Sequence, residues 1–171
     1  MGTLFDWLRG RQPAPIKPTV PKDTAMNALD IATALAKRWE SCRLTAYPDP
    51  VSGGDPWTVG WGATGPSIGP GTVWTQAQAD ADLESRLNQI HVEIAPHCPA
   101  GATAAQIGAC MDFAYNEGVH AFLTSTLLAE WRAGNIAGAA AQFLRWDLAG
   151  GHVVEGLENR RADERRIFLG G

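Results

Sequence analysis

The sequence predicts an α+β fold in which a small antiparallel β lobe is joined to a larger, mostly helical lobe. Residues 43–62 are punctuated by glycine and proline and contain two short runs of β-type residues. Almost everything after Gly71 has the apolar spacing of amphipathic helices, and one further helix is expected before the β-type region. At 171 residues the chain can bury the core of one ordinary domain.

The first helix is expected to begin at Asp23 or Thr24, either of which is a favourable N-cap residue. Its end is expected close to Glu40, before the region rich in glycine and proline. The apolar residues between these ends recur with the helical period; they are Ala28, Ile31, Ala32, Leu35 and Trp39.

The β lobe is predicted from two short runs, RLTAY at 43–47 and WTVGW at 57–61. Both contain β-branched and aromatic residues, and the turn signals PDP and SGGDP lie between them. We therefore expect a hairpin or a three-stranded antiparallel sheet in this region.

The helical lobe is predicted from helix caps and breakers. Thr75 and Gln78 match a capping box, and the helix that they open should end at Pro96. The next helix should begin near Thr103 and be closed by Gly118 as its C-terminal cap. Three further helical segments, each with glycine near its boundary, are expected to complete the chain.

Residues 1–22 differ from the rest and are predicted to be a flexible basic arm. The stretch RQPAPIKPTVPK carries four prolines, which exclude a packed helix. Its charge is basic, because Arg9, Arg11, Lys17 and Lys22 stand against Asp6 alone. A tether to an anionic membrane or partner is the alternative interpretation. Residues 23–171 are predicted to form a single domain.

The composition excludes several classes of function. The net charge is −4 and charged residues make up 19%, so no nucleic-acid partner is indicated. No apolar run approaches the roughly 18 residues that span a bilayer. No basic start with an apolar run typical of a secretory signal is present either. We expect a monomer without stable membrane insertion.

The cysteines do not indicate a metal site. The chain has three cysteines, Cys42, Cys98 and Cys110, and their spacing is not that of metal ligands. The nearby histidines, His91 and His97, add too few ligands for a zinc site. We therefore expect free thiols and no metal.

Glu40 and Asp49 are the candidate catalytic carboxyl groups. Glycoside hydrolysis requires one carboxylic acid that protonates the leaving oxygen and one carboxylate across the sugar that acts as base or nucleophile. Glu40 suits the acid, because a helix end and partial desolvation beside Trp39 both favour the uncharged form. Asp49 lies in the turn YPDP, where exposure to water favours the ionised form.

The stretch WESCRLTAYPD, followed by WTVGWGAT, resembles the catalytic signature of phage-type lysozymes, glycoside hydrolase family 24. In that signature eight residues separate a Glu from an Asp, and a short spacer leads to a Thr and then to Gly-aromatic-Gly. The resemblance continues through residues 73–83, 111–128 and 137–169, so that it covers about residues 26–169.

This resemblance implies a lysozyme-like fold with a cleft between the lobes. It also implies hydrolysis of the β-1,4 bond between N-acetylmuramic acid and N-acetylglucosamine in peptidoglycan, with inversion and without a cofactor. By the same resemblance Glu40 is the general acid, Asp49 is the second carboxylate, and Thr58 helps to position the attacking water.

The loop before Thr58 departs from the family pattern. Eight residues separate Asp49 from Thr58, whereas the family usually has five, and the excess lies in VSGGDP. Asp55 is therefore a rival for the second carboxylate. Asp49 is favoured, because its spacing from Glu40 and its YPD neighbourhood match the family.

Three further assignments are weaker. Asn116 matches a family position on the cleft-facing end of the central helix, with a local cap or backbone hydrogen bond as the alternative. Trp61 is a candidate for stacking on a sugar ring, although most of the tryptophans are expected in core or interlobe packing. Either Arg160 or Arg161 is expected to pair with Glu40, as one arginine does in relatives.

The sequence therefore predicts a peptidoglycan muramidase of phage or prophage origin, an endolysin. A lytic transglycosylase and a non-catalytic wall-binding or virion module are the alternatives; the presence of Asp49 and Thr58 argues against the transglycosylase. Because no export signal is recognised, we expect accumulation in the cytoplasm of the bacterial host and access to the wall after the membrane is permeabilised.

Overall fold

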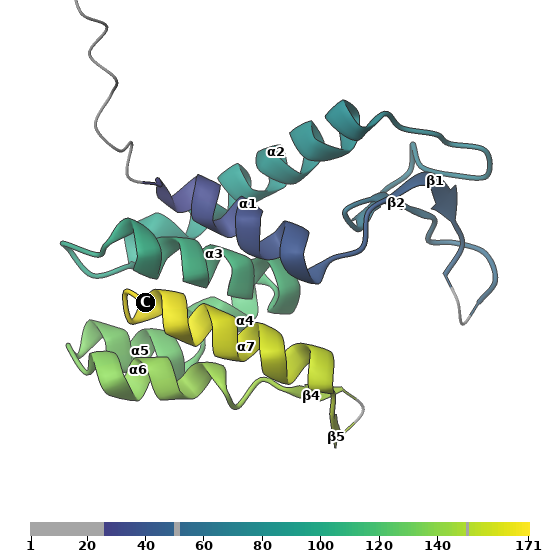
Figure 1. Ribbon diagram of the computed structural model, residues 1–171. Coiled ribbons are helices and arrows are strands. Elements are labelled where there is room, and N and C mark those ends of the chain that lie inside the picture. Colours follow the sequence, from purple (N-terminus) through teal and green to yellow (C-terminus); the bar gives the residue numbers. More distant parts are fainter. Residues whose placement is uncertain (1–25, 50–51, 150) are drawn as a thin grey trace, which may run out of the picture.

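The computed structural model describes residues 26–49, 52–149 and 151–171, which form two lobes (Figure 1). A small sheet with its loops lies to one side, and packed helices make up the rest, as the sequence predicts. The predicted arm, residues 1–22, lies outside the described residues. In the part of the chain that is described, no helix is both long and apolar enough to cross a membrane.

The β lobe is a three-stranded antiparallel sheet in the order β1-β2-β3. Its strands are Arg43–Tyr47, Thr58–Gly60 and Ala63–Thr64. Thr58 lies opposite Tyr47 on one side and opposite Thr64 on the other. The lobe has a small core of its own, made of Ala46, Val59 and Ala63. Of the two predicted arrangements, the three-stranded sheet is therefore the one found.

Helix α1, Ala28–Trp39, begins later than predicted. Asp23 and Thr24 are not its N-cap, because Asn27 takes that role through a capping box with Asp30. The Asn27 side chain accepts a hydrogen bond from the Asp30 amide at 3.0 Å, and the Asp30 side chain accepts from the Asn27 amide at 3.2 Å. The predicted end is confirmed, since Glu40 is the C-cap.

The caps of the next two long helices are confirmed. Helix α2, Gln76–Ile94, opens with the capping box of Thr75 and Gln78, and a short 3₁₀ turn, Ala95–His97, follows it. Helix α3, Ala104–Glu117, ends at Gly118, whose φ of +94° is available to glycine without a steric penalty.

The last part of the chain is not entirely helical, which corrects the prediction. Four helices lie there: α4 Val119–Leu123, α5 Thr126–Arg132, α6 Ile136–Phe143 and α7 Glu155–Phe168. Between α6 and α7 the chain forms a hairpin from β4, Leu148–Ala149, and β5, His152–Val153. The physical reason is the turn, where Gly151 adopts a φ of +82° that favours a tight hairpin over a continued helix.

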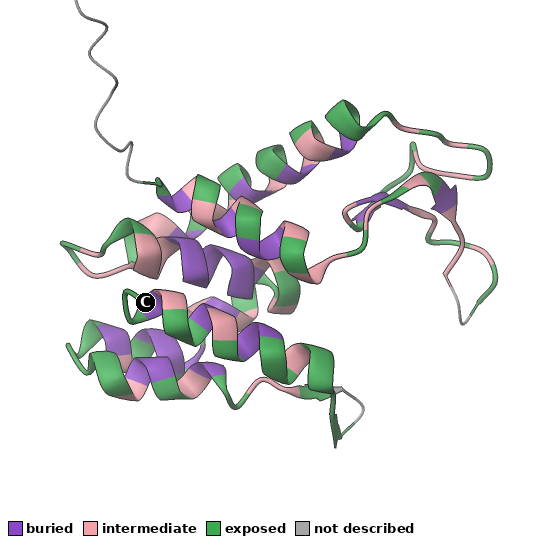
Figure 2. Cartoon of the chain, in the orientation of Figure 1, coloured by how far each residue is buried: buried purple, intermediate pink, exposed green. Residues whose placement is uncertain are grey.

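Helix α3 is the centre of the helical lobe, and Figure 2 shows the burial concentrated on it. All residues from 108 to 114 are buried. Phe113 packs edge-to-face against Phe122, Phe143 and Trp146, with ring centroids 5.2–6.3 Å apart. Any charged group that α3 carries in this stretch is therefore removed from water.

Close packing of α1 on α3 depends on Gly108. A Cβ atom at this position would lie 2.7 Å from Ile31 Cγ2 and 2.9 Å from the Ala28 carbonyl oxygen. Because a larger residue would push the helices apart, glycine here sets the position of α1, and with it the position of Glu40 at the end of α1.

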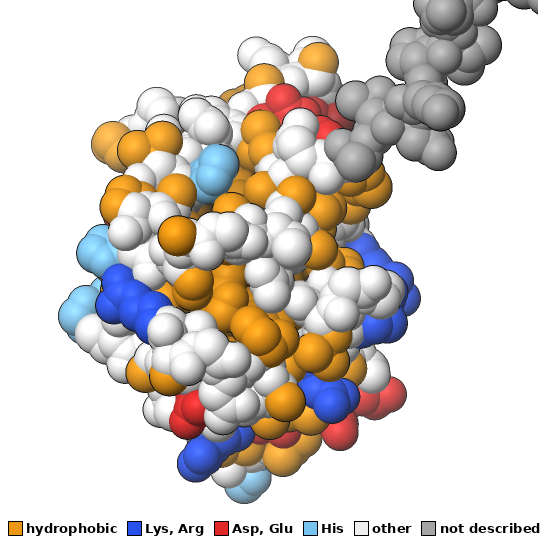
Figure 3. Space-filling view, turned by 90° about the vertical axis from the view of Figure 1, so that its left-hand side faces the viewer, with side chains coloured by type: hydrophobic (Ala, Val, Ile, Leu, Met, Phe, Trp, Pro, Cys, Tyr) orange, Lys and Arg blue, Asp and Glu red, His pale blue; other side chains and the backbone are white. Residues whose placement is uncertain are grey.

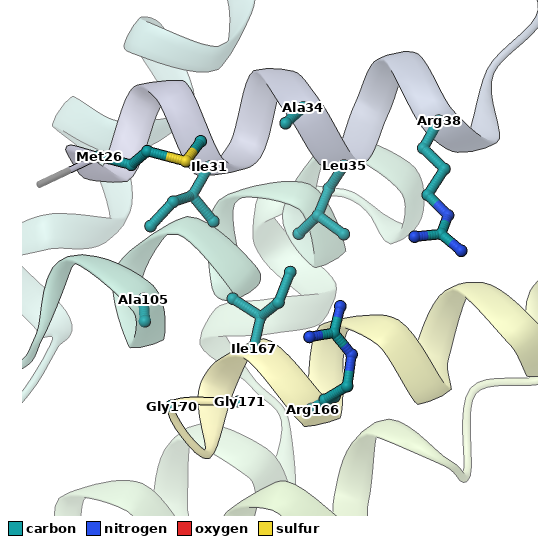
Figure 4. Close-up of a pocket in the computed structure, with 10 residues that line it drawn as sticks. All are labelled: Met26, Ile31, Ala34, Leu35, Arg38, Ala105, Arg166, Ile167, Gly170 and Gly171. Atoms are coloured by element: carbon teal, nitrogen blue, oxygen red, sulfur yellow. The ribbon is translucent and has the colours of Figure 1, made fainter.

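Figure 3 shows hydrophobic side chains gathered on the face of the molecule that is on the left in Figure 1. An apolar groove lies on the helical lobe. It has a volume of about 410 Å³ and runs between α1, the start of α3 and the end of α7 (Figure 4). Its charged side chains are Arg38 and Arg166. Since none of the described residues that line it has a carboxyl side chain, these residues offer no general acid for glycoside hydrolysis.

Candidate active site

Glu40 lies at the C-terminal end of α1, where the chain leaves the helical lobe for the sheet (Figure 1). Its backbone amide caps the helix by donating to the Ala36 carbonyl at 2.8 Å. The side chain is 29% exposed and lines a pocket of about 260 Å³. The other lining residues are Trp39, Asn116, Val154, Gly156, Leu157 and Arg160. The pocket thus has one carboxyl group that is partly shielded but still accessible.

Arg160 is the arginine that pairs with Glu40, which resolves the alternative left open by the sequence. Its Nη1 donates to Glu40 Oε1 at 2.6 Å, although the two residues are far apart in the chain. Its Nε and Nη2 donate to the two oxygens of Asp112 at 3.0 and 2.8 Å. Burial lowers the pKa of Arg160, but the hydrogen bond and charge of Asp112, followed by those of Glu40, raise it overall. Arg160 is therefore a permanent cation.

Arg161 turns to a different set of partners. It donates to Glu117 at 3.1 Å, to Asn116 Oδ1 at 2.9 Å and to Glu164 at 2.8 Å. Its own side chain is fully buried, and this burial lowers its pKa. Arg161 therefore fixes the end of α3 against α7 without contacting Glu40.

Asn116 is brought to the same pocket as Glu40. Its side-chain oxygen accepts from Arg161, so the structure shows neither the local cap nor the backbone bond considered as its alternative. Within the described residues its amide nitrogen has no hydrogen-bond partner, which leaves that donor available on the pocket wall.

Asp49 lies in the β lobe and closes a turn. Its Oδ1 accepts from the Ser52 amide at 2.7 Å, and its backbone exchanges hydrogen bonds with Gly53 and Gly54 at 2.8 and 3.0 Å. The residue is half-buried and is not among those that line the Glu40 pocket. Its position therefore follows from local turn geometry.

Thr58 begins β2, and its neighbour across the ladder is Tyr47, which directly precedes the turn that holds Asp49. The sheet thus keeps Thr58 and Asp49 at the same end of the β1–β2 pair. The rival carboxylate, Asp55, is exposed and lines a different pocket, together with Trp57 and Thr64.

Trp61 joins the β lobe to the helices. Its indole nitrogen donates to Asp80 at 2.7 Å, its carbonyl oxygen accepts from the Tyr115 hydroxyl at 2.6 Å, and Lys37 lies 5.7 Å from its ring centroid. Burial raises the pKa of Tyr115 to about 12, so this hydroxyl remains a donor. Trp61 does not line the Glu40 pocket, and its contacts are those of interlobe packing.

Asp112 is the residue of the site that sequence reasoning missed. It is fully buried in the middle of α3, within the apolar stretch CMDFA. That context was the available signal, because a carboxylate on a buried helix face requires a cationic partner. The partner itself, Arg160 on the last helix, is identified only by the tertiary structure.

The cysteines are not among the described residues that line the Glu40 pocket. Cys42, Cys98 and Cys110 are free, and burial raises the pKa of Cys98 to about 11 and that of Cys110 well above its ordinary value. Within residues 26–49, 52–149 and 151–171, no group of three or more metal-binding side chains is found.

The fold and the site define a lysozyme-like α+β protein, with a carboxyl group held by a buried arginine where its two lobes meet. The family model described as phage lysozyme matches residues 37–164. The chain belongs to the phage lysozyme family.

Solved structures and curated relatives agree with this. The muramidase domain of SpmX from Asticaccaulis excentricus has a TM-score of 0.72 at 30% identity, over 81% of this chain and 94% of that one. A SAR-endolysin of bacteriophage PS119 is 38% identical over 132 residues, 77% of each chain. The endolysin of Bacillus phage PZA is 36% identical over 137 residues, 80% of this chain and 53% of that protein. The chain thus spans about half the length of the Bacillus phage endolysins that it matches.

Proposed function

We propose that this protein is a peptidoglycan hydrolase of the endolysin type, an N-acetylmuramidase that cleaves the β-1,4 bond between N-acetylmuramic acid and N-acetylglucosamine. The observation that carries the proposal is Glu40, a partly exposed carboxyl group in a pocket at the lobe junction of a phage-lysozyme fold. Relatives named endolysin and a neighbour named a muramidase domain support the substrate class.

In this proposal Glu40 protonates the glycosidic oxygen as the bond breaks. Its neighbours suit the task, since Arg160 donates to only one of its carboxyl oxygens and Glu40 lines the pocket. The unpartnered amide nitrogen of Asn116 is the proposed donor to a sugar hydroxyl or acetamido oxygen on the same wall.

Asp49 is the proposed second carboxylate and Thr58 the proposed anchor for the attacking water. The turn that holds Asp49 and the strand that begins at Thr58 present them from the same end of the sheet. We propose an inverting reaction, because a hydroxyl beside the second carboxylate suits an enzyme that places water between carboxylate and sugar. The anomeric form of the first product, followed by proton NMR, tests this step.

We infer that the enzyme acts on the wall of its bacterial host after the inner membrane has been permeabilised. The names of its relatives as endolysins and SAR-endolysins support a role in host lysis. A monomer is sufficient for this role, because Glu40 and its contacting groups come from one chain.

The decisive experiment is digestion of purified sacculi with mass analysis of the new sugar termini. A muramidase releases fragments that end in reducing N-acetylmuramic acid. Fragments that end in 1,6-anhydro sugars would instead identify a lytic transglycosylase, and binding without fragments would identify a non-catalytic wall-binding protein.

A further inference from the structure

The buried charges behind Glu40 form one network between α3 and α7. Besides Arg160, its titratable and charged groups are Glu40 at the end of α1, Asp112, Tyr115 and Glu117 on α3, and Arg161 and Glu164 on α7. The electrostatic effect of Arg160 on the ionisation of Glu40 depends on which other charges in this network neutralise Arg160.

Asp112 is the group that balances Arg160. It is fully buried and takes two of the three guanidinium nitrogens of Arg160, at 2.8 and 3.0 Å, in a bidentate pair. Only Nη1 remains, and it is directed to Glu40. Arg160 therefore has a complete ion pair with Asp112 that does not involve Glu40.

The second buried acid, Glu164, does not supply this balance. It lies 3.6 Å from Arg160 Nε and 2.8 Å from Arg161, and burial raises its pKa well above the ordinary range. Its Oε2 is buried with no hydrogen-bond partner in the described part of the chain, a position that suits a protonated oxygen facing Asp112. Burial thus favours the neutral form of Glu164, and Arg161 has a second carboxyl partner in Glu117.

This arrangement matters because a general acid must hold its proton until the bond breaks. An unbalanced guanidinium 2.6 Å from Glu40 would favour the carboxylate strongly, since an opposite charge at this distance stabilises the ionised form. With Asp112 in place, Arg160 orients Glu40 by a hydrogen bond while its charge is largely cancelled.

We propose that Asp112 is a positioning residue for the reaction: it fixes Arg160 against Glu40 and cancels its charge, so that Glu40 keeps its proton at the working pH. The inference rests on the proposed function, because it assumes that Glu40 is the general acid.

The test is the pH profile of sacculus digestion by Asp112→Asn. Asn keeps the shape and one acceptor, but leaves the charge of Arg160 unbalanced. The alkaline limb of the profile is expected to move to lower pH by at least about one unit. Glu117→Gln is the matched control, because Glu117 belongs to the same network but contacts Arg161 and not Arg160. The alkaline limb of the pH profile of this variant should coincide with that of wild type.

An Asp112→Asn variant that folds by circular dichroism and keeps the wild-type limb overturns the proposal. Should this variant not fold, Arg160→Gln and the double variant Asp112→Asn/Arg160→Gln decide the question. Removing only the cation should move the limb to higher pH, and removing both charges should return it close to wild type. Coinciding limbs for wild type and Arg160→Gln would contradict the proposal.

The same assay separates this inference from the proposed function. A Glu40→Gln variant as active as wild type refutes the acid assignment and the inference with it. If Glu40→Gln is inactive and the limbs of Asp112→Asn and wild type coincide, only the role of Asp112 is refuted.

Discussion

Glu40 and Asp49 stand nine positions apart in the sequence, but the structure holds them in opposite ways. The partners of Glu40 come from distant helices and are buried: Arg160, at 4% side-chain exposure, and behind it Asp112, at 0%. The hydrogen bonds of Asp49 to Ser52, Gly53 and Gly54 are all made within its own turn. The proposed acid is thus held by the packing of distant helices, whereas the hydrogen bonds named here for the proposed second carboxylate come from its own loop.

This difference predicts which part of the proposed site depends on the length of the loop after Asp49. Moving Glu40 would require a repacking of α1, α3 and α7, because Gly108 and the ion pairs of Arg160 hold these helices at fixed distances. Lengthening the loop after Asp49 changes only a turn in the β lobe. We therefore expect the added residues of VSGGDP to affect the second carboxylate and to leave the acid undisturbed.

The largest expected effect tests the rigid side of the comparison. Glu40→Gln keeps the shape of the side chain and an oxygen that can accept from Arg160, but an amide cannot donate the catalytic proton. Sacculus digestion should fall by at least about 100-fold with an unchanged circular dichroism spectrum. Glu117→Gln, the same substitution on the partner of Arg161, serves as the control and should stay near wild type. A Glu40→Gln variant with near-normal lysis would refute the mechanism.

Features that depend on neighbouring residues can be predicted from the sequence, whereas features that depend on contacts between distant helices cannot. The capping box of Thr75 and Gln78 and the end of α1 at Glu40 were read correctly, because caps depend on a few adjacent residues. The choice between Arg160 and Arg161 was not readable, since neighbours on a helix point about 100° apart and only the packing partner selects one. Asp112 was missed for the same reason, because its partner lies on another helix.

Some local signals were also misread. The hairpin at 148–153 lies in a region predicted to be helical, because almost all of the chain after Gly71 has the apolar period of amphipathic helices. The glycines in DLAGGHVV are a two-residue hairpin signal and should have outweighed that period. The N-cap at Asn27 competed with two equally good cap residues upstream, which propensity alone does not separate.

The next largest expected effect concerns Asp49, which lies in a turn of the β lobe. Asp49→Asn retains an oxygen for the Ser52 amide, so the turn should persist while the charge is lost. We expect activity to fall about 100-fold, at the low end of the range for removing one acid-base group. Asp55→Asn, an exposed site, should change it by less than about twofold. Reversed sensitivities would show that the longer loop has exchanged the two carboxylates.

A smaller effect concerns the proton on Glu164 in the rigid region. The folded-state pKa of Glu164 is raised by burial, so the folded protein binds this proton more tightly than the unfolded chain does. Wild-type stability should therefore fall as the pH rises from about 4.5 toward the folded pKa, with a slope of up to about 1.4 kcal/mol per pH unit. Glu164→Gln lacks this slope.

Urea unfolding across this pH window checks the prediction. The stability of Glu164→Gln relative to wild type should increase with pH, whereas Asp163→Asn, the neighbouring acid that pairs with Arg38 near the surface, should show no such increase. A relative stability of Glu164→Gln that decreases with pH would mean that Glu164 is ionised and balances the arginines. Asp112 would then not be the group that cancels Arg160.

The smallest expected effect lies where the two regions meet. If Trp61 is an interlobe anchor, its hydrogen bond to Asp80 supports stability and not substrate binding. Trp61→Phe and Asp80→Ala should then each lower the melting temperature, the double variant should lose less than their sum, and KM should stay within about twofold of wild type. The bond to Trp61, followed by Lys37, lowers the pKa of Asp80. The coupling should therefore be complete above the unfolded pKa of about 3.9 and fade as pH falls through the lower folded value. A KM that rises for Trp61→Phe alone would instead place a sugar against this ring.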